Sequence, residues 1–377
     1  MEQRECAMEN MGIARKSMID KSFWQNKKIF ITGHTGFKGS WLCLWLHLLG
    51  AEITGYALDP PTDPSLFKLC KIGELLRSVT ADVRDGKLLK EAMHESNPEI
   101  VFHMAAQPLV RESYRDPVKT YSTNVMGTVN LFEAVRECKS VKTIINVTTD
   151  KCYENKEWIW GYRENDSMGG NDPYSSSKGC AELITNAYLR SYFDTDNYKE
   201  HGVSLASVRA GNAIGGGDWA EDRLVPDCMR SLMEDKPVVI RFPDAIRPWQ
   251  HIVDLLYGYL LLTQRLYQEG SVFASGWNFG SNYEEAQPVR WIVERITGMW
   301  GYSDSWVVEQ GNKPNEANFL TLDCSKAKSV LGWYPQWDLN VSLRKTVEWY
   351  KALKDQQNML DFTLEQIRSY GRCIDNR

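Results

Sequence analysis

Short apolar runs alternate with amphipathic stretches between residues 28 and 149 of the chain. Each run has the length of a buried strand and ends in glycine or polar residues, which favours strands over buried helices. Because strands and helices alternate, we expect a doubly wound parallel sheet with helices on both faces. The pattern predicts strands at 28–32, 52–58, 78–83, 100–106 and 141–149, and helices at 40–49, 85–95 and 116–138.

Shorter and more aromatic segments follow in the second half of the chain. Interrupted elements of this kind suit a smaller mixed α/β region that covers a substrate cleft. The pattern predicts helices at 224–235, 255–267, 289–298 and 343–353, and brief strands at 238–241, 277–280 and 306–309. We therefore expect four parts: an N-terminal extension (1–22), an α/β domain (23–215), a mainly substrate-binding region with some chain returning to the sheet (216–360), and a docked or frayed C-terminal tail (361–377).

The composition excludes several classes of protein. The 377 residues carry 44 Lys and Arg against 49 Asp and Glu, and a mildly acidic chain without basic blocks argues against nucleic acid as a partner. No apolar run is long enough to span a membrane, and the first twenty residues lack the apolar core of a secretory signal. The nine cysteines and six histidines are scattered, which favours reduced thiols in the cytoplasm and no metal site.

The first strand ends at Gly33, and glycines recur at Gly36 and Gly39 directly before a helix. Glycine lets the backbone approach a phosphate closely, and the helix N-terminus offers unpaired N–H groups and a positive dipole. Plain turns contain such triplets too, but the strand before and the helix after are the context of a dinucleotide site in a Rossmann-type sheet. Asp59 follows the second strand, where a ribose diol would be held, and no Arg stands nearby for a 2′-phosphate. NAD is therefore favoured over NADP, although Asp59 could instead cap a turn before two prolines.

Small and polar residues gather where the fourth and fifth strands end. The fourth strand runs into Ala105, Ala106 and Gln107, which either let a cofactor lie flat on the strand tips or only pack the loop. The fifth runs into Thr149-Asp150-Lys151, which places a hydroxyl, a carboxylate and an amine side by side. The carboxyl ends of parallel strands share one edge, where ligands bind. Surface loops contain such residues as well, so both interpretations stay open at this point.

A further helix is predicted after residue 172, with Asp172 as its N-cap and Pro173 in its first turn. Tyr174 and Lys178 lie four residues apart, so they project from one face of this helix. An ammonium beside a phenol favours tyrosinate and lowers the pKa of the tyrosine, which makes Tyr174 a candidate general base for a sugar hydroxyl. The Y-x-x-x-K spacing is a common coincidence on helices, but much less so downstream of a glycine turn and a fifth strand.

Five motifs can be read together: Gly33-x-x-Gly36-x-x-Gly39, Asp82-Val83, Ala105-Ala106-Gln107, Asn124-Val125-x-Gly127-Thr128 and Tyr174-x-x-x-Lys178. Together these motifs resemble the extended short-chain dehydrogenase/reductase superfamily over residues 24–356, nearly the whole chain. The resemblance implies a homodimer or homotetramer, although core packing explains the apolar residues of helices 116–138 and 174–192 equally well. The implied contacts with NAD are Gly33, Thr35, Gly36, Phe37, Lys38, Gly39, Asp59, Asp82, Val83, Ala105, Ala106, Gln107, Tyr174 and Lys178.

Within that superfamily, Thr149-Asp150 followed by a titratable residue resembles the nucleotide-sugar 4,6-dehydratases. Segments 33–39, 56–61, 149–155 and 209–219 are similar to the branch that takes CDP-glucose, in which Asp-Lys replaces the usual Asp-Glu. The resemblance implies that CDP-glucose loses water through internal, NAD-mediated hydride transfer, an early step of dideoxyhexose and O-antigen sugar synthesis. The implied catalytic residues are Thr149, Asp150, Lys151, Tyr174 and Lys178, and the implied substrate contacts are Gln107, Asn212 and Arg247.

In this scheme Tyr174 takes the proton of the C4 hydroxyl and Thr149 hydrogen-bonds the same oxygen. Asp150 protonates the departing C6 hydroxyl, so burial should raise its pKa and keep it neutral. Lys151 either removes the C5 proton as a desolvated amine or stabilises the C4 enolate as a cation. Two other classes stay open. A nucleotide-sugar epimerase would use Tyr174 and Lys178 without Asp150, and a silent NAD-binding regulator would need none of this proton machinery.

Arg247 and Asn212 are the residues expected to hold the diphosphate of the substrate. A guanidinium can bind phosphate oxygens in a bidentate manner, and an amide can donate to them. Without the resemblance, a surface ion pair for Arg247 and a turn for Asn212 explain these residues as well.

Overall fold

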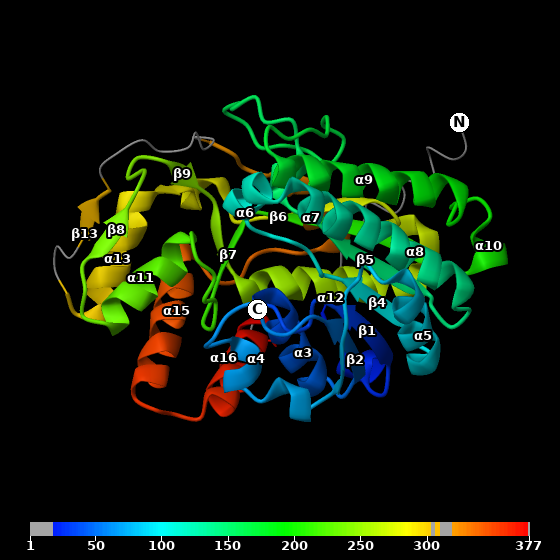
Figure 1. The fold of residues 1–377 in the computed structure, drawn as a ribbon, viewed down its shortest axis with the longest axis horizontal. Coiled ribbons are helices and arrows are strands. Elements are labelled where there is room, and N and C mark those ends of the chain that lie inside the picture. Colours follow the sequence, from blue (N-terminus) through cyan, green and yellow to red (C-terminus); the bar gives the residue numbers. More distant parts are fainter. Residues whose placement is uncertain (1–17, 303–305, 310–318, 376–377) are drawn as a thin grey trace.

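The computed structural model describes residues 18–302, 306–309 and 319–375 (Figure 1). Of the predicted N-terminal extension, residues 1–17 lie outside the described residues. The chain then enters helix α2 (Lys21–Trp24), where the side chain of Asp20 accepts a hydrogen bond from the backbone of Ser22. Trp24 is fully buried, so this short helix is anchored in the core.

Seven parallel strands form the central sheet, in the spatial order β11-β6-β5-β4-β1-β2-β3. The chain moves outward from β1 to β3 and then returns to the other side of β1 with β4, so the strand order reverses between β1 and β4. Ligands of doubly wound sheets bind at the carboxyl edge beside such a reversal. The predicted Rossmann-type fold is confirmed. The strands are β1 (Lys28–Thr32), β2 (Glu52–Ala57), β3 (Arg77–Thr80), β4 (Ile100–His103), β5 (Thr143–Val147), β6 (Ser204–Ala210) and β11 (Gly276–Phe279).

Helices cover both faces of the sheet because alternate strand residues point to opposite sides. Ile29 and Ile31 of β1 belong to one buried cluster, and Phe30 between them belongs to the other. Figure 1 shows the two helix layers on either side of the strands. The first cluster includes α3 (Phe37–Leu48) and α12 (Ile252–Glu269), and the second includes α5 (Gly86–Ser96), α8 (Gly127–Glu137) and α9 (Pro173–Ser191).

A smaller lobe is built from two-stranded ribbons and three helices, and it lies on the left of Figure 1. Its ribbons are β7 (Asn212–Ile214) with β10 (Trp249–His251), β9 (Ile246–Arg247) with β12 (Gln287–Pro288), and β8 (Val238–Ile240) with β13 (Trp306–Val308). Its helices are α11 (Leu224–Met233), α13 (Val289–Trp300) and α15 (Leu339–Lys354). The other helices are α4 (Leu66–Leu69), α6 (Val110–Arg115), α7 (Pro117–Tyr121), α10 (Tyr198–His201), α14 (Ser325–Leu331) and α16 (Met359–Asp375). Single turns are η1 (Ile72–Glu74), η2 (Ser122–Met126), η3 (Asp150–Cys152), η4 (Gly270–Phe273) and η5 (Tyr283–Glu285). Within the described ranges, the helices are too short or too polar to cross a lipid bilayer.

Two helical segments differ from the sequence pattern. The helix predicted at 116–138 is α7 and α8 joined by the π-helical turn η2. The tail predicted from residue 361 forms most of α16, which the pattern did not predict as a helix. Ile367 and Tyr370 of α16 are buried, and the Tyr370 hydroxyl donates to Asp254 Oδ1 at 2.7 Å. The C-terminal helix is therefore part of the core.

Candidate active site

The glycine turn, residues 33–39, joins β1 to α3 with its backbone folded tightly. Gly33 has a φ of +77°, and a Cβ on it would lie 2.7 Å from the backbone nitrogen of Ala105. A Cβ on Gly39 would lie 2.2 Å from the carbonyl oxygen of Gly33, whereas one on Gly36 would lie at 3.4 Å. Gly36 is the N-cap of α3, so the first N–H groups of that helix stay available at the carboxyl edge. A cradle of this kind fits the pyrophosphate of a dinucleotide.

Residues between the glycines connect this turn to β2 and β3. Thr35 Oγ1 donates to the carbonyl oxygen of Leu58 at 2.8 Å, which holds the end of β2, and the exposed Asp59 after it, beside the turn. The His34 ring is buried and lies 2.7 Å from Ser78 Oγ. Burial lowers the pKa of His34 to about 4, so this imidazole is neutral at physiological pH. His34 was not among the predicted site residues, and its place inside the glycine motif was the available signal.

Asp82 and Val83 follow β3 at the same edge. The Asp82 carboxylate accepts hydrogen bonds from Arg84 Nε at 2.9 Å and Nη2 at 2.6 Å, and this pairing holds its pKa below the usual value. Val83 is buried, and a Cβ on Gly127 would lie 2.8 Å from its Cγ2. The structure thus places both residues at the carboxyl edge of the sheet, with the carboxylate already partnered by Arg84.

Gln107, expected to contact both cofactor and substrate, is bound within its own loop. Its Nε2 donates to Leu109 O at 3.0 Å and Thr120 Oγ1 at 2.9 Å, and its Oε1 accepts from Leu109 N at 2.6 Å. Asn124 holds its backbone and also donates to Ser177 Oγ on α9 at 2.8 Å. The side chain of Gln107 therefore braces the loop after β4, and any contact with a ligand would fall to the neighbouring backbone.

The acid turn, residues 149–152, follows β5. Thr149 is the N-cap of η3, and its hydroxyl donates to Asp150 Oδ1 at 2.9 Å. Asp150 is buried, and this burial raises its pKa, the direction expected of a proton donor. Lys151 beside it is exposed. The desolvation that would suit Lys151 to act as an amine base is absent from the structure.

Tyr174 and Lys178 lie in the first turns of α9, and both are more than nine-tenths buried. Lys178 Nζ donates to the carbonyl oxygen of Val147 at 3.2 Å, so it is held at the end of β5. The hydroxyl of Thr149 lies near enough to Tyr174 to lower the pKa of the phenol in part, which places Tyr174 beside the acid turn. Burial nevertheless raises the pKa of Tyr174 to about 12. Burial outweighs the neighbouring charges in setting this pKa, and the prediction that Lys178, together with the nicotinamide charge, lowers it stays a prediction.

Two further cations face this site. Burial, and next the charge of Arg223, lower the pKa of Lys38 to about 8, while Asp150 and Asp218 act in the opposite direction. Lys38 belongs to the glycine turn, and it therefore interacts electrostatically with Asp150 of the acid turn. Arg223 Nη1 pairs with Asp218 Oδ2 at 2.9 Å, and its charge lowers the pKa of Tyr174 in part. The sequence contained no motif around Arg223, so it was not predicted.

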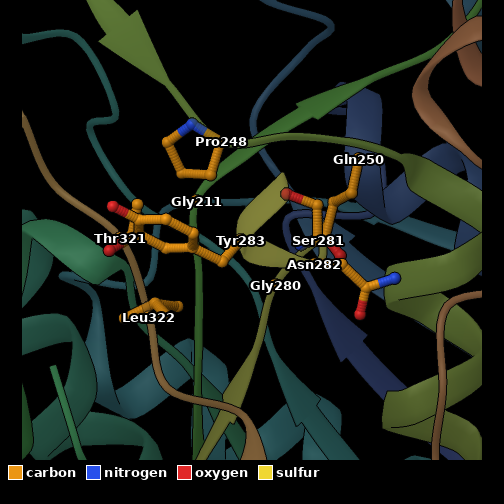
Figure 2. Close-up of a pocket in the computed structure, with 9 residues that line it drawn as sticks. All are labelled: Gly211, Pro248, Gln250, Gly280, Ser281, Asn282, Tyr283, Thr321 and Leu322. Atoms are coloured by element: carbon orange, nitrogen blue, oxygen red, sulfur yellow. The ribbon is translucent and has the colours of Figure 1, made fainter. Parts of the chain in front are cut away.

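Asn212 on β7 pairs with Trp249 in the ribbon of β7 and β10, whereas Arg247 belongs to β9, which pairs with β12. Arg247 lies two residues before β10, and its Nη1 donates to the carbonyl oxygen of Ile246 at 3.1 Å. A small cavity lies next to this ribbon (Figure 2). Its volume of about 10 Å³ is room for about one water molecule. The residues that line the cavity are Gly211, Pro248, Gln250, Gly280, Ser281, Asn282, Tyr283, Thr321 and Leu322.

A doubly wound sheet with a glycine cradle at its switch point and a Tyr–Lys pair on the helix after β5 defines an enzyme of the extended short-chain dehydrogenase/reductase class. Among the residues that the structure describes, no group of three His, Cys, Asp or Glu could hold a metal ion. The model of a family described as GDP-mannose 4,6 dehydratase matches residues 30–346. The chain belongs to this family.

Individual proteins and solved structures are also similar to this chain. The chain is 55% identical over 353 residues to the CDP-glucose 4,6-dehydratase of Salmonella typhimurium, which covers 94% of this chain and 98% of that protein. The structure of dTDP-glucose 4,6-dehydratase from Bacillus anthracis in complex with NAD matches with a TM-score of 0.70 at 23% identity, over 89% of this chain and 99% of that one. UDP-glucose 4-epimerase from Thermotoga maritima, solved with UDP-glucose, gives 0.74 at 21% identity, over 86% and 99%. These two solved structures show the shared fold.

Proposed function

We propose that the chain is an NAD-dependent CDP-glucose 4,6-dehydratase, which converts CDP-D-glucose to CDP-4-dehydro-6-deoxy-D-glucose and water. The observation that carries this proposal is the convergence of Tyr174 and Asp150 on the hydroxyl of Thr149. A base and an acid around one hydroxyl suit a reaction that takes a proton at one sugar carbon and delivers one at another. The relative in Salmonella typhimurium, at 55% identity, supports CDP-glucose as the substrate.

The residues of the glycine turn fit NAD as the cofactor. Gly33 and Gly39 leave no room for a side chain, so the backbone there can approach a pyrophosphate. Asp59 would hold the ribose diol, and Val83 would line the wall beside it. When bound, NAD supplies a hydride acceptor that takes hydrogen from C4 of the sugar and returns it to C6. Since the same sugar gives and receives the hydride, no external oxidant or reductant is consumed.

Tyr174 takes the proton from the C4 hydroxyl, and Thr149 orients that oxygen. Because burial raises the pKa of Tyr174 to about 12, nearby positive charge is required for the phenol to act as a base at neutral pH. Arg223 already lowers this pKa in part, and the positive nicotinamide of bound NAD would lower it further. Lys178, one helical turn away, contributes a cation with a pKa of about 8, lowered chiefly by burial.

Asp150 donates the proton that turns the C6 hydroxyl into departing water. Burial raises the pKa of Asp150, which is the direction required of a proton donor. The ketone formed at C4 acidifies the C5 proton, which passes to a nearby base as the C6 hydroxyl departs as water, and Tyr174 or solvent returns a proton to C5 when the hydride is delivered to C6. The exposure of Lys151 favours the role of a cation that stabilises the enolate over that of a desolvated base.

We assign binding of the substrate diphosphate to two arginines and an asparagine in and next to the smaller lobe. Asn212 lies on β7, Arg247 on β9 lies two residues before the β10 residue that pairs with Asn212, and Arg223 precedes α11 close to Tyr174. Guanidinium groups suit phosphate oxygens because they offer paired N–H donors in a fixed plane. The side chain of Gln107 is left out of this set because its loop occupies it.

The test is to incubate the purified protein with CDP-glucose, dTDP-glucose and GDP-mannose separately. Product is followed by NMR and by the alkali absorbance of 4-keto-6-deoxy sugars. We expect the fastest formation of such a product from CDP-glucose, with release of water. An epimerised sugar that retains its C6 hydroxyl, or no turnover of CDP-glucose, would contradict the proposal.

We further propose a cytoplasmic homodimer or homotetramer. Val118 on α7 and Leu183 on α9 are 76% and 60% exposed, and α7 packs against α9. A second copy of the chain would cover these apolar side chains, and the scattered cysteines suit a reducing compartment. Leu183→Glu should shift the mass measured by light scattering toward the monomer. An unchanged mass would contradict this interface.

A further inference from the structure

A buried network beside the acid turn takes no part in the chemistry proposed above. Its centre is an ion pair between Glu182 on α9 and Arg209 on β6, with 2.8 Å between Arg209 Nη2 and Glu182 Oε2. The side chains are 2% and 6% exposed. Burying two charges carries a desolvation penalty that exceeds their attraction unless the remaining donors and acceptors are satisfied. What else these two side chains bind is therefore informative.

The two partners of this ion pair bind the two ends of the acid turn. Thr148, immediately before the turn, donates its hydroxyl to Glu182 Oε1. Arg209 Nη1 donates at 2.6 Å to the hydroxyl of Tyr153, immediately after the turn. Thr148, Glu182, Arg209 and Tyr153 thus enclose residues 149–152, and we call these four residues the clamp.

The clamp is also fixed to the helix that carries the base. Glu182 lies one helical turn beyond Lys178 and two beyond Tyr174 on α9. At the other end, the Tyr153 hydroxyl donates to Asn278 Oδ1 on β11 at 2.8 Å. Burial pushes the pKa of Glu182 upward, but the charge and hydrogen bonds of Arg209 and the two hydroxyl donors outweigh it, so the net pKa is lowered and the carboxylate stays ionised. The network therefore joins the two ends of the acid turn to α9, β6 and β11.

We propose that the clamp is a positioning device that holds Asp150 in register with Tyr174, so that elimination follows C4 oxidation of the same sugar. This inference rests on the proposed function. None of the four clamp residues serves as base or acid in that scheme; they act through the turn that carries Asp150. Loosening one end should displace Asp150 while Tyr174 and Lys178 stay on their helix. Elimination should then slow more than C4 oxidation.

The variants follow from the geometry. Thr148→Val removes the hydroxyl at one end of the clamp at nearly constant volume, and Tyr153→Phe removes the hydroxyl at the other end. The matched control is Ser207→Ala, because Ser207 Oγ donates to the same carboxylate, at 2.7 Å from Glu182 Oε2, but belongs to β6 and not to the acid turn. Thr148→Ser restores a donor and serves as the rescue. Thermal unfolding of each variant records any general loss of stability.

Two rates separate a positioning role from a merely structural one. Stopped-flow absorbance of reduced nicotinamide reports C4 oxidation, and the alkali absorbance of the 4-keto-6-deoxy product reports the complete reaction. For Thr148→Val and Tyr153→Phe we expect elimination to fall about 10- to 100-fold, with reduced nicotinamide accumulating, since a shift of about 1 Å can reduce a rate by that much. Ser207→Ala and Thr148→Ser should stay within about 3-fold of the wild type for both rates.

The clamp is overturned if Thr148→Val slows elimination no more than Ser207→Ala does, or if both rates fall together in each clamp variant. Failure of the proposed function looks different, because then the wild type itself forms no 4-keto-6-deoxy product from CDP-glucose. A crystal structure of Thr148→Val decides the clamp whatever the substrate. Superposition of residues 149–152 on the wild type would overturn it, and a displaced Asp150 would support it.

Discussion

The glycine turn and the acid turn occupy equivalent places in the fold but are built on opposite physical principles. Each follows a parallel strand, β1 or β5, and each lies at the carboxyl edge of the sheet. The glycine turn works because side chains are absent: a Cβ at Gly39 would lie 2.2 Å from the carbonyl oxygen of Gly33, within the same turn. The acid turn works because the side chain of Asp150 is present and buried, and because Thr148 and Tyr153 at its two ends are held by the distant partners Glu182 and Arg209.

This difference shows which kind of site tolerates which kind of change. A backbone cradle depends on a few neighbouring residues, so it is sensitive to added atoms and insensitive to charge far away. A buried carboxylate such as Asp150 depends on desolvation and on the charges around it, so its proton affinity responds to the whole neighbourhood.

The largest effect is expected at Tyr174, the proposed base beside the acid turn. Tyr174→Phe removes the phenol but keeps the packing of the ring. Formation of reduced nicotinamide after addition of CDP-glucose should fall about 1,000-fold, within the range for loss of a general base. Stopped-flow absorbance measures this rate. A normal absorbance rise would rule out the assigned role.

The next largest effect separates the turns directly. Asp150→Asn cannot donate a proton to the C6 hydroxyl, so product formation should fall roughly 100-fold while C4 oxidation continues. The control is Asp59→Asn, which alters a carboxylate on the side of the glycine turn and should weaken NAD binding without trapping the oxidised sugar. Equal loss of C4 oxidation and elimination in Asp150→Asn would contradict the role of an acid.

The glycine turn should be sensitive to a single methyl group. Gly39→Ala forces a collision with the Gly33 carbonyl, and we expect a loss of about 1–3 kcal/mol in the free energy of unfolding, with a comparable loss in NAD affinity. Gly36→Ala, whose Cβ would meet the same oxygen at 3.4 Å, should cost much less. Urea unfolding and calorimetric titration with NAD measure the pair. Similar losses in both variants would show that the close approach at residue 39 is not what matters.

A smaller effect is expected at Lys151 because its side chain is exposed. If the ammonium stabilises the enolate, Lys151→Met should slow elimination about 10-fold, the loss of one partly screened charge. Deuterium from the solvent should still appear at C5, as NMR of the product would show. Complete loss of this exchange would instead make Lys151 the C5 base.

The smallest effect is expected from the charge of Lys38, in the glycine turn, on Lys178, which is held at the end of β5 beside the acid turn. Burial, and next the charge of Lys38, lower the pKa of Lys178 to about 8, so C4 oxidation should decline as the pH rises through this value and the cation is lost. Lys38→Met removes the repelling charge and should move the decline to higher pH, measured as a pH–rate profile. The unfolded chain binds more protons than the folded one between about 8 and 10.5, so this shift also makes the protein more stable as the pH rises across that interval. A decline that does not move would contradict the coupling.

Several features could be predicted from the sequence because they depend on near neighbours. The spacing of Tyr174 and Lys178 placed both on one face of a helix, and the structure buries both at the end of β5. Other features could not. Arg223 lies outside any motif, and its charge acts on Tyr174, a residue far from it in the sequence. The hydrogen bonds of Gln107 depend on a loop conformation that its neighbours in sequence do not reveal. Helix α16 did carry a signal, since its buried residues Ile367, Tyr370 and Ile374 recur at helical spacing.

The order of amino acids alone established the alternation of strands and helices and the position of the glycine turn. Both depend on hydrophobic period and on backbone freedom within a few residues. Folding in three dimensions established the raised pKa values of Tyr174 and Asp150 and the partners of the ion pair Glu182–Arg209. Those properties depend on burial and on contacts between residues far apart in the chain, and desolvation exists only once the core has closed around them.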